Sequence, residues 1–221
     1  MPALIGFDPV DTLAIQKVIS DARLCLDSAL REAFDDNDRF QTRLAKYFGT
    51  DESNIHAVMK VINSMKLVVD GGLYHVQREL TGHDTTGTGR TETGRAVHFK
   101  SEEIQFGGTA ARRVRTARIQ GTLFYEGKRV NVIEATEQWT ADNGPLDMKF
   151  FDAYFDLPYK AFDAQSQVQV FLHELSHMAG GTVDVDAPAG YEWPGVQYCI
   201  SIKKAAHNAE NYGMFLASYL A

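Results

Sequence analysis

Residues 171–186 read FLHELSHMAGGTVDVD, and this stretch carries the strongest chemical signal in the chain. His173 and His177 stand four positions apart. Positions i and i+4 lie on one face of an α-helix, so both imidazoles can bind the same metal ion. The Gly180-Gly181 pair that follows is typical of a helix end. The stretch therefore predicts a helix that carries two metal ligands, with a chain reversal directly after it.

A catalytic zinc site uses three protein ligands and keeps a fourth position for water. Glu174 follows the first histidine, which places its carboxylate beside that water without making it a ligand. Zinc lowers the pKa of the water, and a glutamate at this position can accept its proton as the water attacks a carbonyl. The alternative interpretation is a chance match or a decayed site. The apolar helical periodicity around the motif favours the zinc site.

The histidines alone leave the third ligand open. Asp184 and Asp186 follow the glycine turn within a few residues, whereas Glu192 and Glu210 lie further along the chain. A carboxylate on the returning chain needs the least additional structure, so the two aspartates are the better candidates. The alternative for Asp186 is a solvated loop carboxylate or a hydrogen-bond acceptor for a ligand histidine.

Three segments together resemble the aspzincin metallopeptidases, the family of deuterolysin and peptidyl-Lys metalloendopeptidase. They are His-Glu-Leu-Ser-His at 173–177, Gly-Gly-Thr-Val-Asp at 180–184 and Asn-Ala-Glu-Asn-Tyr at 208–212. A weaker similarity covers residues 40–220, including Lys-Tyr-Phe-Gly-Thr at 46–50. The resemblance implies a zincin-like fold in which His173, His177 and Asp184 bind Zn²⁺. It also implies that Glu174 is the general base, and it favours Asp184 over Asp186.

The chain departs from the family pattern after the aspartate. A tyrosine is expected three residues further on, where it steadies the tetrahedral oxyanion. Here the first tyrosine after Asp184 is Tyr191, so Tyr191 is the predicted catalytic donor, with Tyr198 as an alternative.

In the lysine-specific members an aspartate takes the place of Glu210 and binds a basic side chain. Glu210 therefore predicts a preference for Lys or Arg after the cut, and the alternative is a surface helix carboxylate.

Composition limits the classes of partner. The chain has 221 residues, a net charge of −7 and a pI near 5.5, which argues against a nucleic-acid binder held by a basic field. No apolar run is long enough to span a membrane, and the N-terminus lacks a secretory signal. We expect a chain that is cytoplasmic as made, a mature form, or a protein exported by a non-classical route. The resemblance extends this to a secreted effector or toxin, with a protein or peptide substrate and an unidentified inhibitor or immunity protein.

The sequence predicts one α+β domain over residues 1–221. A helical part at 1–70 is followed by a β-rich part at 71–150, with a Gly/Thr-rich loop at 81–95, and by a helical part at 151–221 with the zinc site. Helices are expected at 8–34, 38–48 and 51–69, from Pro158 into the zinc motif, and at 196–220 with a break near 207–208. Strands are expected at 95–99, 103–106 and 112–120, and a hairpin at 123–135 with its turn at 126–128.

Two other functions compete with a zinc endopeptidase. The first is a non-catalytic binding module with a structural zinc, which would prefer four closed ligands, often cysteines. Cys25 and Cys199 are the only cysteines and lie far from the motif, which disfavours this function. We expect two buried thiols, with a single disulfide as the alternative. The second competitor is a zinc amidase acting on cell-wall peptides, which could use the same helix.

Overall fold

The computed structural model describes residues 2–72, 74–78, 94–97, 122–125, 128–131, 146–185 and 191–220. It combines helices with two small sheets, so the predicted α+β class is confirmed. The larger sheet has the order β1-β2-β6-β3, from Ala3–Ile5, Tyr74–Arg78, Leu146–Phe150 and Gly94–Val97. β1, β2 and β6 run parallel, with Tyr74 opposite Leu146, and β3 pairs antiparallel with β6. β4 (Thr122–Tyr125) and β5 (Lys128–Asn131) form the predicted antiparallel hairpin.

Three long helices form the N-terminal part, and their ends follow the capping residues. α1 (Pro9–Asp35) begins after Asp8, whose carboxylate accepts a hydrogen bond from the backbone N–H of Asp11 at 2.8 Å. α2 (Asn37–Phe48) ends at Gly49, whose φ of +79° lies in the left-handed region that glycine adopts without strain. α3 (Glu52–Gly71) ends before Gly72 in the same way. The three helices predicted over residues 8–69 are therefore confirmed.

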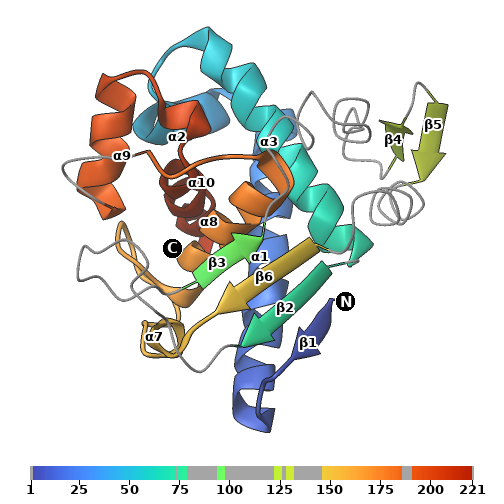
Figure 1. The fold of residues 1–221 in the computed structure, drawn as a ribbon. Helices are drawn as coiled ribbons and strands as arrows, with labels where there is room; N and C mark the ends of the chain where they lie inside the picture. Colours follow the sequence, from blue (N-terminus) through green and yellow to red (C-terminus); the bar gives the residue numbers. More distant parts are fainter. Residues whose placement is uncertain are drawn as a thin grey trace.

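The helix that carries the zinc motif, α8 (Gln167–Gly180), is the centre of the core. Every residue of α8 is buried. α1, α3 and α10 (Ala209–Ala217) pack against it, and β3 and β6 of the larger sheet contact it as well. In Figure 1, α1 and α8 lie behind the four-stranded sheet. This surrounding structure places the motif histidines in a rigid environment on the inside of the protein.

The predicted helix start at Pro158 is wrong. α8 begins nine residues later, because Ser166 caps it by accepting a hydrogen bond from the backbone N–H of Gln169 at 3.2 Å. Between Pro158 and Ser166 the chain is not helical, and Asp163 has a φ of +51°. Phe162 is 64% exposed and is not part of the apolar stripe.

The C-terminal helical region divides near the predicted break. α9 (Glu192–Ser201) starts four residues earlier than predicted, and a short 3₁₀ turn, η1 (Ala205–His207), separates it from α10. A second 3₁₀ turn, η2 (Ser218–Leu220), follows α10, and α7 (Asp152–Phe155) is a single helical turn after β6.

Both cysteines are free and buried, as predicted, and no disulfide joins them.

Several predictions fall on residues outside the described ranges. These are the strands at 103–106 and 112–120, the loop at 81–93 and the hairpin turn at 126–127. Within the ranges given above, none of the helices combines the length and the apolar character that crossing a membrane requires.

Candidate metal centre

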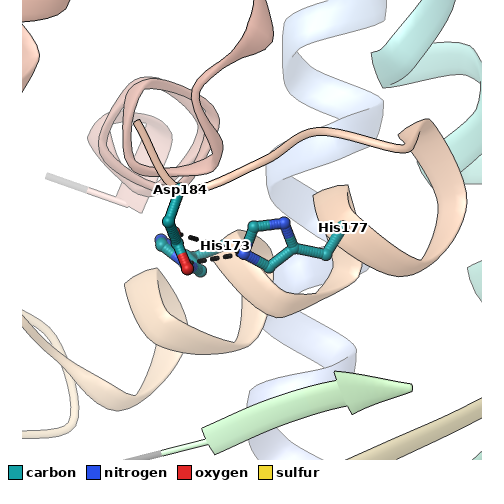
Figure 2. A group of neighbouring side chains, drawn as sticks. All are labelled: His173, His177 and Asp184. Atoms are coloured by element: carbon teal, nitrogen blue, oxygen red, sulfur yellow. Dashed lines mark hydrogen bonds and ion pairs between the residues drawn. The ribbon is translucent and has the colours of Figure 1, made fainter. Parts of the chain in front are cut away.

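Two histidines of α8 and one aspartate after it bring their ligand atoms together (Figure 2). Nε2 of His173 lies 3.1 Å from Nε2 of His177. Oδ1 of Asp184 lies 3.1 Å from the first of these nitrogens and 3.3 Å from the second. A tetrahedral zinc ion with bonds of about 2.0–2.1 Å separates its ligand atoms by about 3.3–3.4 Å. The triangle therefore has the size that one such ion requires.

The other nitrogen of each ring fixes its tautomer. Nδ1 of His177 lies 2.7 Å from the backbone carbonyl oxygen of Thr182, and Nδ1 of His173 lies 2.9 Å from Oε2 of Glu210. A carbonyl can only accept a hydrogen bond, so Nδ1 of His177 carries a proton. The Glu210 carboxylate also accepts, so Nδ1 of His173 carries a proton as well. When both rings are neutral, their Nε2 atoms present lone pairs to each other; without a metal ion, a proton on Nε2 of His173 instead binds Asp184. Two lone pairs at this distance repel, and a cation between them removes the conflict.

Electrostatic interactions within the cluster shift the pKa values of His173 and Asp184. Burial alone would lower the pKa of His173, but hydrogen bonds with Asp184 and Glu210 outweigh it and raise this pKa well above its ordinary value. Burial would raise the pKa of Asp184, but hydrogen bonds from His173 and His177 hold it well below its usual range. Asp184 is therefore a carboxylate throughout the physiological pH range, as a metal ligand must be.

The turn after α8 brings Asp184 back to the histidines. Gly181 has φ and ψ of 63° and 28°, and its backbone N–H closes the helix on the carbonyl of His177 at 3.1 Å. The chain then pairs with the segment before α10: the N–H of Val183 donates to the carbonyl of His207 at 2.9 Å, and Ala209 donates to Val183 at 3.0 Å. Asp184 follows directly, so its position depends on this short pairing.

The remaining predicted residues lie around the cluster. Glu174 is buried and lies close enough to His173 to raise that residue's pKa. Tyr191 is 39% exposed, with its ring centroid 6.1 Å from that of His173. Asp186 lies outside the described residues. Tyr198 is half-buried on α9.

Glu210 occupies a different environment from a surface carboxylate. It is only 2% exposed. Its Oε2 accepts hydrogen bonds from Nδ1 of His173 and from Nε2 of Gln169 at 3.0 Å, and its Oε1 accepts one from the backbone N–H of Glu192 at 2.7 Å. The surface alternative is therefore wrong. The predicted contact with a basic substrate side chain stays a prediction, and the protein itself already occupies both oxygens.

Sequence reasoning missed the residues that orient the ligands. Gln169 stands four positions before His173 on the same face of α8, which is a signal that a search for helical neighbours could have used. Thr182 accepts from His177 through its carbonyl, and its hydroxyl lies 2.7 Å from that of Ser176. Asn208 contacts the Asp184 segment across a gap of 23 positions, which local patterns do not reveal.

Comparison with known proteins supports the architecture. No protein-family model matches the chain, and a search of curated proteins finds no match. Among solved structures, the chain is similar to a zinc peptidase from Grifola frondosa, with a TM-score of 0.56 and 17% sequence identity. The match covers 97% of this chain and 99% of that chain. The two proteins share a fold. At this level of identity, the shared fold is what the comparison establishes.

Proposed function

We propose that the protein is a zinc-dependent endopeptidase of the aspzincin type. The observation that carries the proposal is the triangle of ligand atoms from His173, His177 and Asp184, with sides of 3.1–3.3 Å. The structural neighbour, a zinc peptidase with the same fold, supports it.

The donor set fits a catalytic zinc ion. Two neutral imidazoles and one carboxylate are typical catalytic ligands, and they leave a fourth position for water or substrate. Among the residues that the structure describes, the only group with metal-ligand geometry is this set of three. A closed structural site would need a fourth protein ligand, so the geometry disfavours a purely structural zinc.

The chemistry divides between the ion and the chain. A bound zinc ion supplies Lewis acidity, which polarises the scissile carbonyl and lowers the pKa of water. Glu174 accepts the proton of the attacking water and then returns it to the leaving amine. Tyr191 donates a hydrogen bond to the carbonyl oxygen as negative charge develops on it. Glu210 and Thr182 keep the two imidazoles in the ligating tautomer.

The substrate preference and the biological role of the protein are also proposed. A preference for Lys or Arg after the cut rests on the acidic character of Glu210, and such a side chain would have to displace a bond that Glu210 already makes. A role as a secreted effector or toxin rests on the sequence alone. Mapping of cleavage sites in a denatured proteome tests the first, because a basic preference would appear as Lys or Arg directly after the cut.

The variant Glu174→Gln tests the proposed reaction. It should retain about one zinc per chain, because Glu174 is not a ligand, and it should lose cleavage of an unfolded protein by at least about 10²-fold. Asp184→Ala should instead lose zinc. Assays on peptidoglycan fragments beside the protein substrate distinguish the endopeptidase from a cell-wall amidase. Full protein cleavage by Glu174→Gln would refute the assigned base.

A further inference from the structure

The segment Asn-Ala-Glu-Asn-Tyr at 208–212 contacts the metal centre from two sides. Glu210 binds His173, as described above, and Asn208 binds the chain directly after Asp184. We infer that Asn208 is a positioning residue that holds Asp184 in place as the third metal ligand. This inference rests on the proposed metal centre and adds the structural cause of its third ligand.

A chain of side-chain amides links the Asp184 segment to α2. Oδ1 of Asn208 accepts a hydrogen bond from the backbone N–H of Val185 at 3.1 Å. Nδ2 of Asn208 donates to Oδ1 of Asn211 at 2.6 Å, and Nδ2 of Asn211 donates to the backbone carbonyl of Tyr47 at 2.6 Å. Asn208 is 4% exposed and Asn211 is fully buried, so these bonds form away from solvent.

The two ends of this chain fix the orientation of both amides. The carbonyl of Tyr47 only accepts, so the NH₂ group of Asn211 must face it and the oxygen of Asn211 must face Asn208. Asn208 then turns its NH₂ group to that oxygen and its own oxygen to the N–H of Val185. Each hydrogen bond thus fixes the amide orientation of the next residue. The side-chain oxygen of Asn208, and not its NH₂ group, therefore faces the N–H of Val185.

Asp184 stands on a short, partly exposed segment that needs to be held in place. Its side chain is about half exposed (47%), and the preceding Val183 is also exposed. The backbone bonds of Val183 to His207 and Ala209 secure the chain before Asp184. The bond from Val185 to Asn208 secures it after Asp184. The side chain of Val185 also packs against the core, but this apolar contact does not fix the direction of the backbone, so without the bond to Asn208 Oδ1 could leave the ligand triangle.

A double-mutant cycle on zinc affinity tests this role. The affinities of the wild type, Asn208→Ala, Asp184→Ala and the double variant are measured by competition with a chromophoric zinc chelator. Loss of a residue that orients a ligand typically weakens metal binding by about 10–100-fold. We expect Asn208→Ala to weaken zinc binding by about tenfold when Asp184 is present, and by less than about twofold when Asp184 is absent.

Asn54→Ala is the matched control. The side chain of Asn54 also donates to a backbone carbonyl, that of Phe48 at 3.0 Å, and is not part of the amide chain. This variant should lower the thermal stability of the zinc-free protein and leave zinc affinity unchanged. If Asn208→Ala does not fold, Asn208→Ser gives the same comparison, because its hydroxyl is too short to reach Val185.

The outcomes are separable. Equal losses in the presence and absence of Asp184 would show that Asn208 does not act through the aspartate, and would overturn the inference. Wild-type affinity in Asn208→Ala, or Asn208→Ser, would overturn it as well. A wild-type protein that binds no zinc would instead refute the proposed metal centre, and the role of Asn208 with it.

Discussion

Replacement of Gly213 by alanine should disturb the metal centre without touching a ligand. Gly213 lies on α10, where a Cβ atom would stand 2.8 Å from Nε2 of Gln169, 2.9 Å from the backbone oxygen of Gln169 and 3.2 Å from Cβ of His173. The last two atoms belong to the buried helix α8 and cannot move aside easily. The added methyl group must therefore push α8 and α10 apart or rotate His173.

The magnitude follows from two opposing effects. Overpacking a buried site costs about 1–3 kcal/mol, whereas alanine in place of glycine favours a helix by about 1 kcal/mol. We expect the free energy of unfolding of the zinc-free protein to fall by up to about 2 kcal/mol. This corresponds to a Tm lower by up to about 8 °C for a chain of this length. Zinc affinity should fall by about tenfold or more, because His173 is displaced from its place in the ligand triangle.

Gly180→Ala provides the comparison for this prediction. The three heavy atoms nearest to its Cβ atom would all belong to the side chain of Val61, the nearest at 2.5 Å. Urea unfolding should show that both variants are destabilised, and chelator competition should show weaker zinc binding in Gly213→Ala alone. Gly213→Ala with unchanged zinc affinity and a clear loss of stability would refute the proposed link between α10 packing and His173.

Three further results are expected. Adding Val61→Ala to Gly180→Ala should restore part of the lost stability in urea unfolding, since it removes the methyl groups that the new Cβ atom meets. Glu210→Gln should weaken zinc binding less than Glu210→Ala in chelator competition, because the amide oxygen can still accept from His173; equal losses would argue against an orienting role. The zinc-free protein should lose stability as pH rises through the raised pKa of His173, since its paired, protonated form stabilises the fold fully only below the ordinary histidine value of about 6.5. The lowered pKa of Asp184 should act in the opposite direction, with stability lost as pH falls below about 3.8, and urea unfolding across the pH range measures both.

The parts of the fold that the sequence predicts are those specified by neighbouring residues. Apolar spacing predicted α1, α2 and α3, and the i, i+4 histidines with a glycine turn predicted the face of α8 and the return of an aspartate, which the resemblance to aspzincins narrowed to Asp184. These features need only helix geometry and a left-handed residue. The error at Pro158 arose because proline permits a helix start without requiring one, and the Ser166 cap determined the actual start.

Long-range pairing accounts for what the sequence does not reveal. The strands β1, β2 and β6 have three to five residues each, and Tyr74 pairs with Leu146 across 72 positions, so no local pattern identifies their partners. Gln169 reaches Glu210 across 41 positions, and Asn211 reaches Tyr47 across 164. Such contacts depend on tertiary packing, which is why the candidate ligands could be predicted from local sequence, whereas the contacts of Glu210 and Asn211 could not.

Zinc K-edge X-ray absorption on the zinc-loaded protein tests the central claim most directly. The proposed centre predicts four light ligands at about 2.0–2.1 Å, with the multiple-scattering pattern of two imidazoles, and loss of one imidazole signal in His177→Ala. A sulfur ligand at about 2.3 Å, or a spectrum that does not change in His177→Ala, would show that His173, His177 and Asp184 do not hold the zinc ion.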